Sequence, residues 1–213
     1  MSRRSFISYE FSFKHETVKL TVDNKYGDLR TIKKRTHAHI VKAVNKNNQN
    51  VVAMKKTQQL NDPDDARRIY RECVLLRTIQ HKNLITLLDT FIPADSNDLY
   101  LVSESMEVSM RELLRLPSTD PRNLKNMVWN PNNGDHFTAN VMFQMFRGLQ
   151  YLHQDKLEFI HQDIKPENIL LKQSTEGNWL LKICDLGLAE QLMGKNLTNY
   201  MTTYSYRAPE VII

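Results

Sequence analysis

Long apolar runs and cysteines are scarce in this chain, and each shortage excludes a class of protein. No run approaches the roughly 18 apolar residues that a membrane-spanning helix needs. The first residues, MSRRSFISYEFSF, lack the apolar core of a signal peptide. The two cysteines, Cys73 and Cys184, fit neither a disulfide framework nor a zinc site. The sequence therefore predicts an intracellular protein that does not span a membrane.

The remaining composition is ordinary for a globular protein. The 213 residues suffice for one large domain or two small lobes. Hydrophobic residues make up 41 % of the chain and charged residues 25 %. The formal net charge is +5, but the basic residues are scattered and interleaved with acids. A solvated, mildly basic surface therefore explains this charge better than a nucleic-acid-binding surface does.

Strand patterns dominate the first half of the chain. Between Lys19 and Lys56, short segments rich in Val, Ile and Thr are broken by DNKYGD and NKNNQN, which predicts antiparallel strands joined by turns. The segments NLITLLDTFI and DLYLVSE predict two further strands. One helix interrupts this pattern, with Asp62 as its N-cap and Pro63 at its first position. Its apolar stripe recurs at helical spacing, at Ile69, Cys73, Leu76 and Ile79.

The second half is mainly helical. HFTANVMFQMFRGLQYLHQ predicts a second strong helix, followed by loops and short strands. The segment from Leu116 to Asp135 before it is loop-like and unusually long, which favours a disordered spacer, with a partner-binding loop as the alternative. A strand-rich half with one helix followed by a helical half predicts an α+β, two-lobe fold.

A lysine and a glutamate are predicted to pair in the first half. In the alternating strand VVAMKK, Lys55 shares a face with Val51 and Ala53. Glu72 lies beside the apolar stripe of the helix that follows. Because a lysine and a glutamate that both point inward each need a partner of opposite charge, Lys55 and Glu72 are predicted to pair with each other. Such a pair holds a lysine against a polyphosphate. By itself the signal is weak, because a lysine at the end of a strand is usually solvated.

Two further motifs carry polar groups suited to phosphoryl transfer. In HQDIKPENILL, the Asp163 carboxylate can accept the proton of an attacking hydroxyl, Lys165 can balance phosphoryl charge, and the Asn168 amide oxygen can bind Mg²⁺. In LLKICDLGLAE, Asp185 follows an apolar strand, where a hard carboxylate suits Mg²⁺, and Gly187 permits a turn.

Taken in order, these motifs resemble the protein-kinase signature set. VAMK, the helix with Glu72, HQDxKxxN, DLG and RAPE follow one another from Tyr26 to Ile213. YRECVLLRTIQHKNLITLLDTFIPA and TNYMTTYSYRAPEVI are most similar to the mitogen-activated protein kinases, in particular their stress-activated branch. The resemblance implies a protein-kinase-like fold: an N-terminal extension (1–25), a β-rich N-lobe with one helix and a hinge (26–106), and an incomplete, mainly helical C-lobe (107–213).

The resemblance also implies a role for each matching residue. Lys55 and Glu72 form the ion pair, Asp163 is the catalytic base, Lys165 contacts the γ-phosphate, and Asn168 and Asp185 bind Mg²⁺. Thr203 and Lys165 are typical of serine/threonine kinases, and Arg207 lies with Thr203 on the substrate side. ATP is expected to contact Lys55, the gatekeeper Ser103, the hinge backbone at Glu104 and Met106, and apolar groups of Val41, Ala53 and Leu170. The alternative for the apolar residues is ordinary core packing.

The segment after DLG departs from the family. Thr198 and Tyr200 are the implied phosphorylation sites, although TNY is alternatively an unmodified loop tripeptide. Three family arginines are replaced, by Gln162, Glu190 and Tyr204, while those at Arg68, Arg71 and Arg207 remain. Because arginines order such a loop around a phosphate, phosphorylation is expected to order it less strongly here. The Tyr204 replacement also weakens the expectation of proline-directed specificity.

The glycine-rich loop and the end of the sequence depart as well. KKRTHAHIV places Lys34, Thr36 and His39 at the three glycine positions, with a slip of one residue left open. Side chains there hinder the approach of phosphate to backbone N–H groups, although Lys34 adds attraction. The sequence ends at APEVII, before the remaining large-lobe helices, and we expect a fragment with an apolar end.

Two functions therefore stay open. One is a serine/threonine kinase of the mitogen-activated type that uses ATP and Mg²⁺, acts on protein substrates and is activated by an upstream dual-specificity kinase. The other is a pseudokinase or scaffold, favoured by the lost glycines and arginines, with little turnover expected from these 213 residues alone. The resemblance further implies a monomer in the cytoplasm or nucleus, without nucleic-acid or membrane partners.

Overall fold

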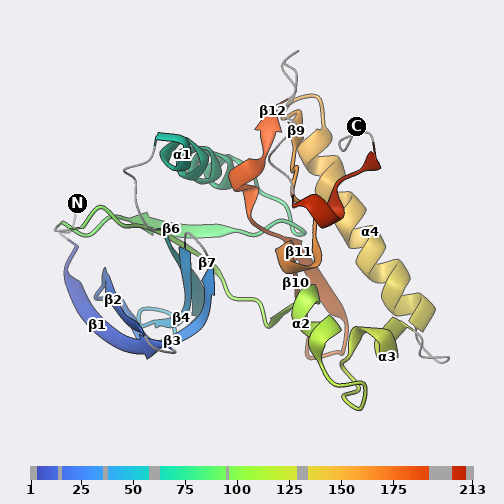
Figure 1. Ribbon diagram of the computed structural model, residues 1–213, viewed down its shortest axis with the longest axis horizontal. Helices are drawn as coiled ribbons and strands as arrows, with labels where there is room; N and C mark the ends of the chain where they lie inside the picture. The colour runs from blue at the N-terminus through green and yellow to red at the C-terminus, as the bar shows by residue number, and fades with distance from the viewer. Residues whose placement is uncertain are drawn as a thin grey trace. The chain divides into compact units, whose positions relative to one another are not determined.

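The computed structural model describes residues 4–13, 16–35, 38–57, 63–94, 96–128, 134–191 and 203–209. The chain divides into two compact units (Figure 1). The first comprises residues 1–73 and 86–105, and the second comprises residues 74–85 and 106–213. Strands dominate the first unit, and the longest helix lies in the second, so the predicted α+β arrangement is confirmed.

The first unit is built on a five-stranded antiparallel sheet of order β3-β4-β5-β7-β6. Its strands are β3 (Tyr26–Arg35), β4 (Ala38–Asn45), β5 (Val51–Thr57), β6 (Leu87–Phe91) and β7 (Leu99–Glu104). They lie in the segments where alternation and turn residues predicted strands. At the β4–β5 turn, the Asn47 backbone N–H donates to Asn45 Oδ1 (3.0 Å), which illustrates why asparagine-rich segments make tight connections. Helix α1 (Pro63–Thr78) begins at the predicted proline, while Asp62 lies outside the described residues.

A hairpin that sequence analysis missed covers one face of this sheet. Its strands, β1 (Phe6–Phe13) and β2 (Glu16–Asp23), pair antiparallel and form the first blue segments of Figure 1. Val18, Leu20 and Val22 of β2 join the buried side chains of the sheet in one core cluster. We had expected strands only from Lys19 onward, although apolar residues also alternate along β1.

An ion-pair cluster ties the start of the chain to β6. Asp89 accepts hydrogen bonds from the Arg4 guanidinium (2.8 Å) and the Tyr26 hydroxyl (3.1 Å), and its other ion pair is with Lys25 Nζ (2.8 Å). Burial alone would raise the pKa of Asp89, but the bonds from Arg4 and Lys25 outweigh it and hold that pKa below its ordinary value. Burial also raises the pKa of Tyr26, so its hydroxyl stays a donor.

Acid is therefore expected to weaken the first unit through Asp89. A carboxyl whose folded-state pKa is lowered stabilises the fold fully above its unfolded value of about 3.9, and this contribution is lost as the pH falls through the folded value. We expect Asp89→Asn to lower the free energy of unfolding at neutral pH by about 1–3 kcal/mol and to flatten its acid dependence. Urea unfolding between about pH 6 and 3, with exposed Asp155→Asn as the control, measures both. An unchanged slope in Asp89→Asn would contradict the assignment.

The second unit combines short strands with helices. Helix α4 (Gly134–His153) packs against β11 (Trp179–Ile183), which continues into the sheet β11-β10-β8 with β10 (Ile169–Gln173) and β8 (Val108–Ser109). The second predicted helix is thus confirmed as α4. A further strand pair joins β9 (Phe159–Ile160) to β12 (Glu190–Gln191). Short helices complete the unit: α2 (Met110–Arg115), η1 (Pro166–Asn168), η2 (Leu186–Leu188) and η3 (Tyr204–Tyr206).

The segment after α2 is more ordered than predicted. We expected a loop from Leu116 to Asp135, with a disordered spacer favoured, but residues 124–128 form helix α3 (Leu124–Val128). Asparagine side chains stabilise the turns before it, because Asn126 Nδ2 donates to Asp120 O (2.8 Å) and Asn123 Nδ2 donates to Leu116 O. Residues 129–133 lie outside the described part.

Gln144 is the centre of a buried polar network in the second unit. Its Oε1 accepts from Leu181 N (3.0 Å) and from Asn83 Nδ2 (2.9 Å), and its Nε2 donates to Trp179 O (2.7 Å). Both amide side chains are buried. Gly148, one turn further along α4, permits this close packing, since a Cβ there would lie 3.1 Å from Asn83 O. The network therefore joins α4 to β11 and to residues 79–85.

The opposite side of α4 is exposed. Met142, Phe143 and Phe146 are 39 %, 59 % and 59 % exposed, and the Arg147 guanidinium lies over the Phe143 ring, 5.6 Å from its centroid. None of the described helices is long and apolar enough to cross a membrane.

Candidate active site

The predicted lysine and glutamate meet in the first unit. Lys55 Nζ on β5 lies 2.9 and 2.8 Å from the two carboxylate oxygens of Glu72 on α1. Glu72 is only 5 % exposed in its side chain, and Lys55 is 25 % exposed. A buried carboxylate is stable only with such a partner. The ammonium is therefore held in one position on the face of the sheet opposite the hairpin.

The pairing register shows which residues share that face. Ile40 pairs directly with Lys55, and Ala53 pairs directly with Ser103, so all four side chains lie on one side of the sheet. Val41 pairs instead with Met54 and belongs to the core cluster under the hairpin. The predicted contact of Val41 with a purine therefore does not fit, and Ile40 is the β4 residue directly opposite Lys55. This register agrees with the slip of one residue that KKRTHAHIV leaves open.

The other residues predicted near ATP fall in both units. Glu104 ends β7, where its Oε1 accepts from Thr86 N (3.0 Å). Met106 is buried, and Leu170 is half-buried on β10, both in the second unit. Of the three residues at the expected glycine positions, His39 is buried on β4. Lys34 pairs with His39 one residue before the end of β3, but its side chain, like Thr36, lies outside the described part.

Four predicted residues come together in the second unit around the carboxylate of Asp163. Its Oδ2 lies 2.6 Å from Lys165 Nζ and accepts from Asn168 Nδ2 (3.0 Å). Its Oδ1 accepts from the Thr203 hydroxyl (2.7 Å), whose oxygen in turn accepts from Lys165 Nζ (2.7 Å). Asp163 is 7 % exposed. A nearly buried carboxylate is thus already hydrogen-bonded to an alcohol and balanced by an ammonium.

His161 positions this loop, a role that sequence reasoning missed. The Asp163 backbone N–H donates to His161 Nδ1 (3.2 Å), so Nδ1 carries no proton, and Nε2–H donates to Cys184 O (3.1 Å). Burial lowers the pKa of His161, which keeps the ring neutral. The neutral ring therefore links the loop of Asp163 to the residue before Asp185.

The predicted metal ligands fit a Mg²⁺ ion. Asn168 Oδ1 is buried without a hydrogen-bond partner among the described residues, while its amide nitrogen is occupied by Asp163. The Asn168 carbonyl accepts from Cys184 N (2.9 Å), which places Asp185 one residue from that contact. Asp185 has a left-handed backbone (φ 67°), a strained state found at functional sites. Within the described ranges no group of three or more His, Cys, Asp or Glu side chains is arranged to hold a metal ion. Mg²⁺, however, commonly uses one or two protein oxygens together with phosphates and water.

Two of the residues that replace family arginines, Gln162 and Glu190, contact each other. Gln162 Nε2 donates to Glu190 Oε2 (3.2 Å), and the adjacent strands β9 and β12 pair beside them. Gln162 adopts φ 64°, so this orientation is maintained against backbone strain. Tyr204 is exposed, and the Arg207 guanidinium lies 5.5 Å from the centroid of its ring. Thr198 and Tyr200 lie outside the described residues.

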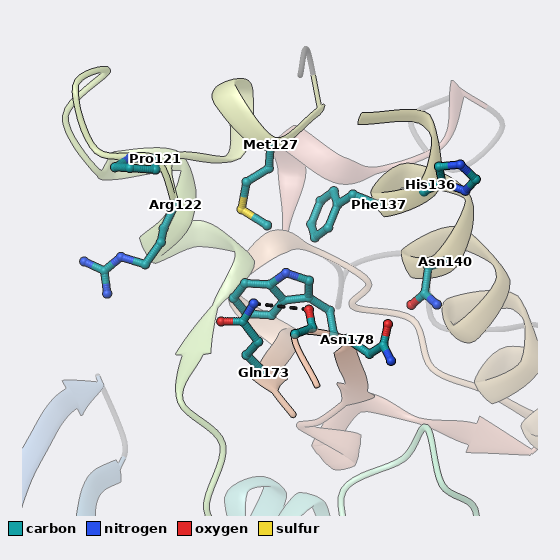
Figure 2. A pocket seen from close by; sticks show the side chains of 10 residues that line it. Pro121, Arg122, Met127, His136, Phe137, Asn140, Gln173 and Asn178 are labelled. Atoms are coloured by element: carbon teal, nitrogen blue, oxygen red, sulfur yellow. Dashed lines mark hydrogen bonds between the residues drawn. The ribbon is translucent and has the colours of Figure 1, made fainter. Parts of the chain in front are cut away.

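A separate cavity of about 540 Å³ opens between α3, the start of α4 and the β10–β11 turn. Figure 2 shows Phe137 and Met127 at its wall, with the polar side chains of Asn140, Asn178 and Gln173 around it. The Phe137 and Trp179 rings meet edge to face at 6.2 Å. No predicted site residue lines this cavity.

The comparisons agree with the signature motifs. Residues 26–213 match the protein kinase domain family. The chain is 34 % identical to mitogen-activated protein kinase 3 of Oryza sativa subsp. japonica over 198 residues, which cover 90 % of this chain and 48 % of that protein. It is 36 % identical to mitogen-activated protein kinase hog1 of Blastobotrys adeninivorans over 166 residues, which cover 78 % of this chain and 36 % of that protein. The chain thus spans at most about half the length of these relatives, and the match shows that it belongs to the protein kinase domain family, with mitogen-activated protein kinases among its similar members.

Proposed function

We propose that this chain carries the catalytic residues of a serine/threonine protein kinase of the mitogen-activated type, which transfers the γ-phosphate of ATP to protein hydroxyls. The observation that carries the proposal is the Asp163 carboxylate, which accepts a hydrogen bond from the Thr203 hydroxyl at 2.7 Å beside Lys165. A substrate hydroxyl needs the same acceptor when it loses its proton.

The residues have separable tasks in this mechanism. Asp163 takes the proton of the attacking hydroxyl, and Lys165 neutralises charge beside it. Asn168 and Asp185 would hold Mg²⁺, and Lys55, oriented by Glu72, would hold the phosphates. When bound, the Mg²⁺–ATP complex supplies the transferable phosphoryl group. The buried Asn168 Oδ1, which has no hydrogen-bond partner among the described residues, supports the metal assignment.

The relatives suggest how the chain is used. Their names describe mitogen-activated protein kinases. By analogy we propose that this chain acts on protein substrates and that an upstream kinase modifies Thr198 and Tyr200. The contact between Gln162 and Glu190 supports weaker control by phosphate, since an amide and a carboxylate stand where arginines would bind it. A monomeric state and a cytoplasmic or nuclear location remain predictions from the resemblance.

One specific observation favours the scaffold function. None of the six glycines lies between Asp28 and Val41, where a phosphate-cradling loop is expected. A measurement of nucleotide affinity therefore distinguishes the kinase from the scaffold.

Calorimetry of ATP binding with and without Mg²⁺ tests the proposal. We expect binding that requires Mg²⁺ and that Lys55→Met and Asp185→Asn each weaken by at least about tenfold, the loss typical of one strong charged contact. The matched controls are Lys156→Met and Asp155→Asn, which change two exposed residues of the second unit. A folded chain that binds no nucleotide supports the scaffold instead.

A further inference from the structure

We propose a second anion-binding site in the first unit, for a small organic phosphate, on the opposite face of the sheet from Lys55. A cavity of about 390 Å³ opens between the β1–β2 hairpin and the β6–β7 turn. Its polar lining consists of two lysines, three hydroxyl residues and one carboxylate: Lys19, Lys56, Ser8, Thr21, Ser96 and Asp98. None of them belongs to the candidate active site.

The key group is the Lys56 ammonium. Lys56 follows Lys55 on β5, so its side chain points to the opposite face of the sheet. The buried Met54, two residues earlier, lies on that same face. The residue is 9 % exposed, and its Nζ bonds to Asp98 Oδ2 (2.8 Å) and to Lys19 O (2.9 Å). An ammonium has three N–H donors. The third finds no acceptor among the described residues and is available to the cavity.

The rest of the lining is also rich in donors. The Ser8 and Thr21 hydroxyls share one hydrogen bond (2.9 Å), which leaves one of their two O–H groups available. Ser96 Oγ accepts from Asp98 N (3.0 Å), so its own O–H has no described partner. The exposed Lys19 adds a second ammonium. Among the described lining residues Asp98 is the one acid, and it already neutralises Lys56. The available donors and the net positive charge of the described lining favour a ligand that is anionic and rich in acceptors.

The size of the cavity narrows the ligand class. A volume of about 390 Å³ is several times that of a bare phosphate ion, and the apolar groups of Phe6, Pro93 and Ala94 line the remainder. A phosphate monoester fits both parts: its oxygens match the lysines and hydroxyls, and its organic group contacts the Phe6 ring.

Phenyl phosphate is the probe, titrated into the whole chain and followed by NMR chemical shifts. We expect saturable binding that Lys56→Met and Lys19→Gln each weaken by at least about tenfold and that rising salt weakens further. Inorganic phosphate should bind more weakly because it lacks the organic contact, and uncharged phenol should not bind. Lys156→Met is the surface control.

Lys55→Met separates this site from the nucleotide site. It should weaken ATP binding by at least about tenfold and leave phenyl phosphate binding unchanged, whereas Lys56→Met should weaken phenyl phosphate binding and leave ATP binding unchanged. If Lys55→Met also removes phenyl phosphate binding, the probe occupies the nucleotide site and the inference fails. Equal affinity in Lys19→Gln and the unaltered chain, or equal binding of phenol, overturns it as well. Because Lys19 is exposed, Lys19→Gln keeps the test valid even if Lys56→Met unfolds.

Discussion

Replacement of Asp163 by asparagine is expected to lower the rate of phosphoryl transfer by a factor of about 10²–10⁴, the usual contribution of a general base. The amide has nearly the same shape but cannot take the proton of the attacking hydroxyl. Its NH₂ group would also face Lys165 Nζ or the Thr203 hydroxyl, since both oxygens of Asp163 now accept hydrogen bonds. The loss should therefore appear in kcat.

The measurement compares phosphate incorporation into a serine- and threonine-containing protein by the unaltered chain, Asp163→Asn and the control Asp155→Asn. Calorimetry on the same samples should give ATP affinities that agree within about threefold, because Asp163 is not expected to hold the nucleotide. Equal rates in Asp163→Asn and the unaltered chain would remove Asp163 as the base. A chain that binds ATP but transfers no phosphate contradicts the catalytic proposal for these 213 residues.

Gln144→Ala is expected to be the most destabilising of the stability variants, lowering the free energy of unfolding by about 2–5 kcal/mol. The change leaves the buried Leu181 N–H, the Trp179 carbonyl and one donor of Asn83 without the partner each has now. Each unsatisfied buried group costs about 1–3 kcal/mol. A cavity in place of the side chain adds to the loss.

Urea unfolding followed by circular dichroism measures this loss, with Gln150→Ala as the matched control on the exposed side of α4. Hydrogen exchange gives a local readout, because the Leu181 amide should exchange faster in Gln144→Ala before global unfolding. A change below about 1 kcal/mol, equal to that of a surface substitution, would show that water replaces the side chain.

The motifs with local patterns were predictable from sequence. Alternation in VVAMKK set the face of Lys55, and helical spacing set Glu72 beside the buried stripe, so their contact followed from two local periods. The grouping of Asp163, Lys165 and Asn168 followed from their spacing within one loop. These inferences needed no knowledge of how distant segments pack.

Features that depend on register or on long-range contacts were not predictable. A shift of one residue moves a side chain to the other face of a sheet, and KKRTHAHIV contains no glycine that fixes the count. Only the pairing of Ile40 with Lys55 shows that Val41 faces the hairpin. The contact of Gln162 with Glu190 joins residues 28 positions apart, and the lowered pKa of His161 depends on burial of its ring, which no local pattern reveals.

The exposed face of α4 sets a limit on how this chain behaves in a cell. Met142, Phe143 and Phe146 present neighbouring apolar side chains to solvent, and surfaces of this kind are what chaperones and aggregation pathways recognise. A folded chain that displays them is expected to associate with other apolar surfaces as its concentration rises. That association would then depend on whether another protein surface covers these phenylalanines.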